Sequence, residues 1–285
     1  MTGARRDKAR VESGKPRFIS PRAPRRSGSA RSTAWEGEVA RWYDVQVGEK
    51  GGYFQRDLVF PGVIRLLNLK AGENLLDVAC GQGAFCQQVQ RLGVRVTGVD
   101  SSQKLIESAR RKSGKQVRYL LGDARHLENA LANEAGKFDA VTCVLAVQNI
   151  DPLAPLFEGF SKLLRKGGRI VIAMVHPCFR VPRQSGWGWD EERKLQFRRV
   201  DRYLSPLEVP IQIHPGSAPQ VTAWTFHRPL YAYVESMARV GLLIDAVEEW
   251  PSPKASQPGP TAKAENRARE EIPLFMAIRA VKISG

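Results

Sequence analysis

One stretch of this sequence decides its fold: Leu75-Leu76-Asp77-Val78-Ala79-Cys80-Gly81-Gln82-Gly83-Ala84-Phe85. It starts as an apolar strand, has an acidic residue near the strand's end, continues through a glycine-rich turn and reaches a helix start. Open α/β sheets bind nucleotide-like cofactors at such turns, because glycines allow close approach of the backbone and the helix N-terminus offers free N–H groups. The stretch therefore predicts an α/β protein with a nucleotide-like cofactor site.

Strands and helices alternate after residue 74, the pattern typical of a parallel sheet covered by helices on both faces. The predicted strands are 74–79, 94–99, 116–121, 138–145 and 168–175, and the predicted helices are 84–92, 102–112, 126–134 and 153–165. The last of these helices is expected to stop at Lys166-Gly167-Gly168.

The pattern changes in residues 176–229, which are rich in proline and aromatic residues and have no sustained period. This segment is predicted to be an irregular insertion that caps a substrate. A helix at 230–241, a strand at 242–249, a polar loop at 251–270 and a final strand at 272–282 are expected to follow. Residues 35–285 are thus expected to form one domain.

The formal net charge of +15 is concentrated near the N-terminus. Residues 1–34 contain ten Lys/Arg and two Asp/Glu, and few apolar residues. We expect a disordered basic tail, because so little apolar surface cannot offset the entropy of ordering. RNA binding and organelle targeting are alternative uses of this tail. No apolar run is long enough to span a bilayer, so the sequence predicts a cytoplasmic protein.

Two further acidic residues follow apolar strands. Asp100, beside Ser101, ends the strand after the glycine turn, where a carboxylate can accept hydrogen bonds from ribose hydroxyls. Asp123 follows the next strand, beside the small residue Ala124, where an acid suits an exocyclic adenine amine. The dinucleotide motif G-x-G-x-x-G is incomplete, since Cys86 occupies the third glycine position. An NAD-dependent oxidoreductase is therefore disfavoured.

This succession of motifs resembles the class I S-adenosylmethionine (SAM)-dependent methyltransferases. The resemblance implies a seven-stranded, mostly parallel, doubly wound sheet whose last strand is antiparallel. It implies SAM as cofactor. The residues that it assigns to SAM binding are Asp77, Ala79, Gly81, Gly83, Asp100, Ser101, Asp123, Ala124 and Ala146. Ala79 stands where many members of the family have glycine.

Two histidines are candidates for a catalytic base. His176 follows the fifth strand, and His227 lies at the end of the insertion. A histidine near neutral pKa can take a proton from a hydroxyl or amine nucleophile. The four histidines form no cluster with other ligand types, so no metal site is expected.

The segment Leu145 to Pro152 lies where this family places the reactive methyl, and it lacks the Asn/Asp-Pro-Pro-aromatic motif of enzymes that methylate base amines. It looks more like the small-molecule subgroup, which includes quinone-biosynthesis C-methyltransferases. The sequence therefore predicts methyl transfer from SAM to an O, N or C nucleophile of a small molecule. An RNA-modifying methyltransferase and a non-catalytic SAM-binding partner protein stay open, and the sequence does not specify the oligomeric state.

Overall fold

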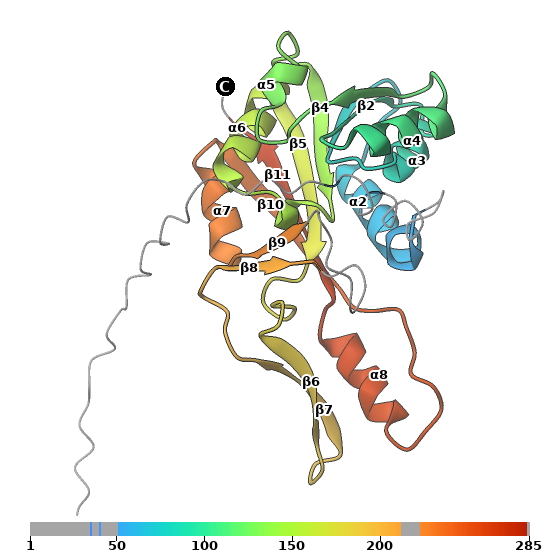
Figure 1. Cartoon of the computed structure of the whole chain (residues 1–285), viewed down its shortest axis with the longest axis vertical. Helices are drawn as coiled ribbons and strands as arrows, with labels where there is room; N and C mark the ends of the chain where they lie inside the picture. Colours follow the sequence, from blue (N-terminus) through green and yellow to red (C-terminus); the bar gives the residue numbers. More distant parts are fainter. Residues whose placement is uncertain (1–34, 36–39, 41–50, 212–222, 284–285) are drawn as a thin grey trace, which may run out of the picture.

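The computed structural model describes residues 35, 40, 51–211 and 223–283 (Figure 1). The basic tail predicted for residues 1–34 lies outside the described residues. So does most of the segment between Trp35 and residue 50. No helix in the described part of the chain is long and apolar enough to cross a membrane.

A seven-stranded sheet with the order β10-β11-β5-β4-β1-β2-β3 forms the centre of the molecule (Figure 1). All of its neighbouring pairs are parallel except those that β11 makes with β10 and β5. The predicted mostly parallel sheet with an antiparallel last strand is thus confirmed. Its strands are β1 (Asn74–Val78), β2 (Arg95–Asp100), β3 (Arg118–Leu121), β4 (Phe138–Val144), β5 (Leu164–Val175), β10 (Leu242–Trp250) and β11 (Phe275–Lys282).

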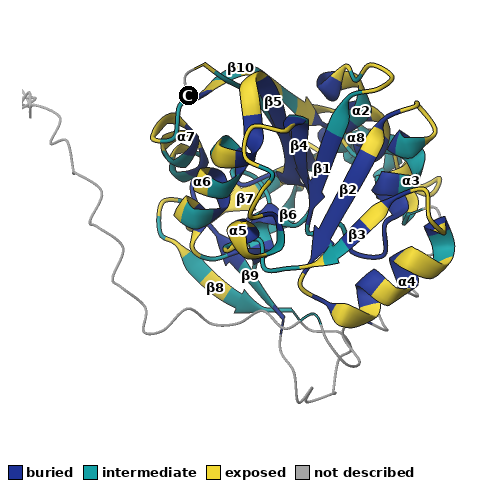
Figure 2. Ribbon diagram, turned by 90° about the horizontal axis from the view of Figure 1, so that it is seen from above, coloured by how far each residue is buried: buried dark blue, intermediate teal, exposed yellow. Residues whose placement is uncertain are grey.

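Helices cover both faces of the sheet, and the core is therefore split into two apolar clusters (Figure 2). One cluster includes residues of α5 (Leu127–Ala130), α6 (Leu153–Leu163) and α7 (Leu230–Ala238). The other includes residues of η1 (Gln55–Val59), α2 (Phe60–Leu67), α3 (Ala84–Gln90) and α4 (Gln103–Ser113).

The central strand β1 shows why this sequence forms a two-faced sheet. Successive side chains of a strand point to opposite faces. Leu75 accordingly packs in one cluster and Leu76 in the other, and both are fully buried. A strand buried on both faces reads as a continuous apolar run, as β1 does.

The insertion 176–229, for which the sequence showed no regular period, contains two antiparallel hairpins. The first consists of β6 (Ser185–Asp190) and β7 (Leu195–Val200), and it extends away from the sheet (Figure 1). The second consists of β8 (Leu207–Pro210) and β9 (Trp224–His227). Residues 212–222, between β8 and β9, lie outside the described part.

The polar loop predicted for 251–270 is wrong in its second half, where the chain forms α8 (Ala262–Glu271). This segment consists mainly of Ala, Lys, Glu and Arg, which favour helices. It lacks an apolar stripe, and within it only Ala268 is buried. Without that stripe, the periodic signal for a helix was absent.

The predicted helix stop at Lys166-Gly167-Gly168 is also wrong. Helix α6 ends at Leu163, and β5 begins at the next residue. The glycines lie inside β5, where the pairing with β4 shifts register between Phe138 and Ala140. Gly167 has a φ of 71°, a conformation that glycine adopts without a steric penalty.

The packing of the core can be tested by truncating one of its buried side chains and measuring the free energy of unfolding. Phe157 of α6 is fully buried and packs edge-to-face on Phe160 with ring centroids 5.7 Å apart. Phe157→Ala should lower the free energy of unfolding by about 3–5 kcal/mol, because it leaves a cavity. The control Leu243→Ala, on a side chain that is 56% exposed in β10, should change it by about 0.5 kcal/mol or less. Urea denaturation of both variants measures the difference, and equal losses would contradict the assignment of the core.

Candidate active site

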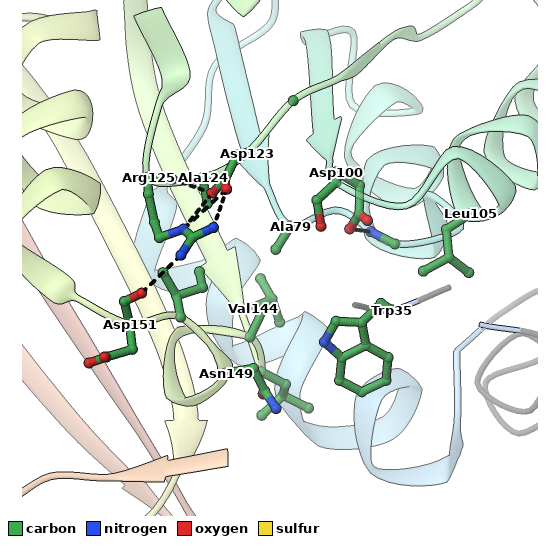
Figure 3. A pocket seen from close by; sticks show the side chains of 16 residues that line it. Trp35, Ala79, Asp100, Leu105, Asp123, Ala124, Arg125, Val144, Asn149 and Asp151 are labelled. Carbon is green, nitrogen blue, oxygen red and sulfur yellow. Dashed lines mark hydrogen bonds and ion pairs between the residues drawn. The ribbon is translucent and has the colours of Figure 1, made fainter. Parts of the chain in front are cut away.

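One cavity lies at the carboxyl ends of β1, β2, β3 and β4 (Figure 3). From β1 the chain continues to β2 on one side, whereas β4 pairs on the other side, so the cavity sits at the switch point of the sheet. This first cavity has a volume of about 190 Å³. Its lining residues are Trp35, Ala79, Gly81, Asp100, Ser101, Leu105, Gly122, Asp123, Ala124, Arg125, Val144, Leu145, Ala146, Asn149, Ile150 and Asp151.

Asp100 is the most constrained acid of the first cavity. Its Oδ2 accepts a 2.8 Å hydrogen bond from the Gly81 N–H, and its Oδ1 accepts one of 2.9 Å from the Ser102 N–H. Burial raises the pKa of Asp100, and the two backbone hydrogen bonds oppose that rise. Each carboxylate oxygen can accept a second hydrogen bond, so the group can hold the glycine turn and still bind a hydroxyl pair.

Asp77 lies behind the glycine turn and does not line the first cavity. Its carboxylate accepts hydrogen bonds from Thr142 Oγ1 at 2.9 Å and from Cys86 Sγ at 3.2 Å. Burial raises the pKa of Asp77 to about 7, and the hydrogen bonds from Cys86 and Thr142 work against that rise. A small neighbouring cavity, which Asp77 lines with Gln82, adjoins it. Gly83 lines neither of these spaces.

Asp123 is paired with a residue that the sequence did not single out. Its Oδ2 lies 2.5 Å from Arg125 Nη2, and its Oδ1 accepts a 2.8 Å hydrogen bond from the Arg125 backbone N–H (Figure 3). Burial tends to raise the pKa of Asp123, but the hydrogen bonds and charge of Arg125 outweigh it and lower this pKa. Arg125 Nη1 also reaches the backbone oxygen of Asp151 at 3.3 Å. The pair thus connects the end of β3 with the loop after β4.

Two non-glycine residues of the cavity have left-handed backbones. Ala79 has a φ of 57° and Leu145 a φ of 55°, and they follow β1 and β4, which are neighbours in the sheet. This conformation costs an L-residue roughly 1–2 kcal/mol. Such strain is concentrated at binding sites, where the surrounding structure enforces it. Ala79 therefore holds a backbone conformation that glycine would adopt without this cost.

A second cavity, of about 410 Å³, adjoins the first. The two share Trp35, Leu145 and Asn149 among their lining residues. The other residues that line the second cavity are Gln148, Val175, Pro177, Arg180, Pro182, Ile211, Thr225, Phe226, His227, Arg228 and Tyr233. Most of them belong to the insertion, which therefore forms one wall of this space.

The insertion is tied to the loop after β4 by polar contacts. Asn149 Nδ2 donates a 3.0 Å hydrogen bond to the backbone oxygen of Trp224 in β9. Arg228 Nη2 lies 2.5 Å from Asp151 Oδ1 and donates to the backbone oxygen of Ile150 at 2.8 Å. Because these residues are buried or half-buried, the contacts fix the wall of the second cavity against the sheet.

The structure corrects the expected position of His176. The side chain is 1% exposed and lines neither cavity. Its Nδ1 accepts a 3.2 Å hydrogen bond from the Cys178 N–H, so Nε2 carries the proton that it shares with Glu249 Oε1 at 2.6 Å. Burial lowers the pKa of His176, although Glu249 opposes this. With both ring nitrogens engaged, His176 anchors the chain after β5 to β10.

His227, by contrast, lines the second cavity. Its Nε2 donates a 2.7 Å hydrogen bond to the backbone oxygen of Tyr203, which leaves Nδ1 as the unprotonated nitrogen. Burial lowers the pKa of His227, and the charge of Arg228 lowers it further. The imidazole is therefore neutral near pH 7 and able to accept a proton.

Seven of the nine residues expected to bind the cofactor line the first cavity, the exceptions being Asp77 and Gly83. Three further residues that line this cavity, Arg125, Asn149 and Leu105, were not predicted from the sequence to bind a ligand. Trp35 lines both cavities. Within the described residues, no group of three or more His, Cys, Asp or Glu is arranged to hold a metal ion.

Comparison with known proteins agrees with this geometry. Residues 76–172 match the family model described as a methyltransferase domain. A ubiquinone biosynthesis O-methyltransferase of Xanthomonas axonopodis pv. citri is 30% identical over 139 residues, which cover 48% of this chain and 56% of the relative. The corresponding protein of Xanthomonas campestris pv. campestris is 31% identical over 140 residues. The match thus spans little more than half the length of these relatives.

Solved structures show the same fold. An S-adenosylmethionine-dependent methyltransferase from Mesorhizobium loti superposes with a TM-score of 0.61 at 26% identity, covering 78% of this chain and 96% of that one. The Haemonchus contortus phosphoethanolamine N-methyltransferase 2, solved with S-adenosyl-L-methionine, has a TM-score of 0.55 at 20% identity and covers 87% of this chain and 57% of its own.

The matched domain, the strand order and the position of the cavity lead to one conclusion. This chain carries a class I SAM-dependent methyltransferase domain, and SAM is the cofactor of that class.

The buried acid Asp77 predicts a pH dependence of stability. Its pKa is about 7 in the folded protein against a usual value of 3.8. Between these values the folded state keeps a proton that the unfolded state has lost, so stability falls as the pH rises. Asp77→Asn should remove this contribution, on the order of 2 kcal/mol between pH 5 and pH 8. Urea denaturation at both pH values measures it.

The control for this test is Asp245→Asn, at a carboxylate that is 37% exposed and faces Arg279. This variant should keep the full pH dependence of the wild-type protein. An equal loss of stability with pH in wild-type protein and Asp77→Asn would contradict the raised pKa of Asp77.

Proposed function

We propose that the protein transfers the methyl group of SAM to a small molecule, with SAM in the first cavity and the acceptor in the second. One observation supports this most directly. The two cavities share Trp35, Leu145 and Asn149, so molecules bound in them would meet at the carboxyl end of β4. A cytoplasmic location, expected from the sequence, is part of the same proposal.

The residues of the first cavity fit SAM. The free acceptor sites of Asp100 suit the ribose hydroxyls, and Asp123 with Ala124 suits the adenine amine. Gly81 has no side chain and the strained Ala79 has only a methyl group, so their backbone is accessible from the cavity, where the methionine part of SAM would bind. Ser101 and Ala146 complete the wall. Asp77 would act from behind the turn, through Thr142 and the small adjoining cavity.

The chemistry needs little beyond positioning. When bound, SAM supplies a methyl group that is already activated by its sulfonium charge. The protein's part is to hold the acceptor in line, exclude water and remove a proton where the nucleophile carries one. Trp35 and Leu145, at the junction of the cavities, would exclude water. His227 Nδ1 is the atom that we propose as the proton acceptor.

The small-molecule substrate class is favoured by the named relatives. The Xanthomonas proteins are named O-methyltransferases of ubiquinone biosynthesis, whereas the sequence resemblance also included C-methyltransferases of quinone biosynthesis. A hydroxyl acceptor would require a base such as His227. The alternative of RNA modification depends on the basic residues 1–34, which lie outside the described residues, and on the arginine-rich insertion.

The substrate class can be tested directly. Purified protein is incubated with SAM labelled in its methyl group and with a cell extract, and the label is followed in the small-molecule, RNA and protein fractions. We expect label in the small-molecule fraction. Label confined to RNA would favour the alternative, and no transfer to any fraction would favour a SAM-binding protein without catalysis.

The position of Asp100 in the first cavity leads us to predict that its carboxylate binds the ribose of the cofactor. Asp100→Asn should weaken binding of S-adenosylhomocysteine roughly tenfold or more, because a charge-assisted hydrogen bond is lost. Calorimetry with S-adenosylhomocysteine and its 2′-deoxy analogue isolates the ribose contact. Wild-type protein should prefer the hydroxylated ligand, and the variant should lose that preference. Asp245→Asn is the matched control, and an unchanged preference in Asp100→Asn would exclude the ribose contact.

If His227 accepts the proton of the nucleophile, turnover should depend on pH. His227→Gln should lower kcat by about 100-fold, the usual scale for loss of a general base, with unchanged affinity for S-adenosylhomocysteine. The wild-type rate should fall as the pH drops through the pKa of His227, and the variant should lack this fall. Turnover on the acceptor found in the labelling experiment measures both. The control His126→Gln alters a side chain that is 59% exposed and should keep the wild-type profile.

A further inference from the structure

The wall of the second cavity carries a cation that has no acidic partner in the part of the chain that the structure describes. Arg180, in the loop after β5, lines this cavity, and no carboxylate of the described residues pairs with it. Its Nε and Nη2 donate to the backbone oxygens of Pro273 and Ile272, each at 3.3 Å. Nη1 has no hydrogen bond within the described part of the chain. The head group is thus held in place, with one nitrogen left for a ligand.

The surroundings of Arg180 increase the local positive charge. Its guanidinium carbon lies 5.0 Å from the centroid of the Trp187 ring, and that of Arg198 lies 5.3 Å from the same ring. Arg198 donates to the Phe179 backbone oxygen and to Ser185 Oγ, and it forms no ion pair with a carboxylate of the described residues. Burial lowers the pKa of Arg180 to about 10, and the charge of Arg198 contributes.

The other arginine of this wall shows the contrast. Arg228 lies 2.5 Å from Asp151, so its charge is balanced inside the protein. Arg125, on the adjoining first cavity, is balanced by Asp123 in the same way. Partly burying an unbalanced guanidinium costs free energy. An anion from outside the chain would offset that cost at Arg180.

The rest of the second cavity indicates what kind of anion fits. Apolar side chains make up much of its lining, among them Val175, Pro177, Ile211 and Phe226. Gln148 Oε1 is buried without a hydrogen-bond partner among the described residues. A buried acceptor of this kind is satisfied by a donor such as a hydroxyl or an amine. Among the described residues that line the second cavity, Arg180 is the one cation that no acid balances, which suits a monoanion better than a phosphate dianion.

We infer that Arg180 binds a carboxylate of the methyl acceptor, and that the acceptor is an apolar carboxylic acid bearing a hydroxyl or amine. This inference rests on the proposed function, since it names the substrate class of the second cavity. Arginine suits the role because its planar head group recognises carboxylates through charge-assisted hydrogen bonds. Arg180 would orient the acceptor from the end of the cavity that the insertion forms.

The test uses two probes of matched shape, 4-hydroxybenzoate and 4-hydroxybenzamide, which differ in charge. Calorimetry is performed on the full chain with and without S-adenosylhomocysteine. Wild-type protein should bind the carboxylate roughly tenfold or more tightly than the amide. Arg180→Gln should lose this preference, and Arg180→Lys should keep part of it. Arg183→Gln removes an equal charge from an exposed residue that lines neither cavity, and should keep it fully.

The outcomes separate this inference from the proposed function. Equal binding of the two probes, binding of neither, or a preference that survives in Arg180→Gln would overturn the carboxylate site. Tighter binding of phenyl phosphate than of 4-hydroxybenzoate would also overturn it. If S-adenosylhomocysteine binds in any of these cases, the proposed function stands without Arg180. If S-adenosylhomocysteine does not bind, the proposed function fails, and the probe titrations without it still decide the role of Arg180.

Discussion

The site depends on a single buried carboxylate that accepts two backbone hydrogen bonds. Asp100 binds the N–H of Gly81, in the turn after β1, and the N–H of Ser102, which caps α4. One side chain therefore fixes a glycine turn and a helix start relative to each other. Burial opposes the charge of this carboxylate, and the two donors offset part of that cost. The geometry of the neighbouring cavity follows from this arrangement.

The two cavities are built by different means. The first lies at the ends of strands whose positions the sheet fixes, and its strained residues Ala79 and Leu145 are held by that rigid frame. The second is closed by the insertion, which is tied to the loop after β4 through Asn149 and Arg228. The geometry of the first cavity thus follows from the sheet, whereas that of the second depends on an insertion that lies outside the sheet.

The sequence predicted those features that follow from local pattern. Strand ends are visible as the ends of apolar runs, so Asp100 and Asp123 were placed correctly at the sheet's edge. The residues that surround these acids in space were not predicted. Arg125 contributes only through a side-chain contact with Asp123, which the spacing of residues in the sequence does not encode.

Contacts between distant segments explain the remaining differences. His176 looked like a base because it follows a strand, yet its partner Glu249 belongs to β10, far along the chain. Asp77 turned away from the first cavity because Thr142 of the neighbouring strand β4 offers its side chain a donor. Helix α8 gave no amphipathic signal. Each of these depends on tertiary packing, which a pattern within one segment does not specify.

The place of β11 in the sheet has a consequence for the order in which the molecule assembles. This late strand lies between β5 and β10, and Phe275 pairs with Val175 across the whole insertion and α7. Closing so long a loop is entropically costly and slow, whereas β1 to β4 are joined by short local crossovers. We therefore expect the strands that frame the first cavity to form before β11 pairs. Most lining residues of the second cavity belong to the loop that β11 closes, so we expect that cavity to be completed only when the last strand is in place.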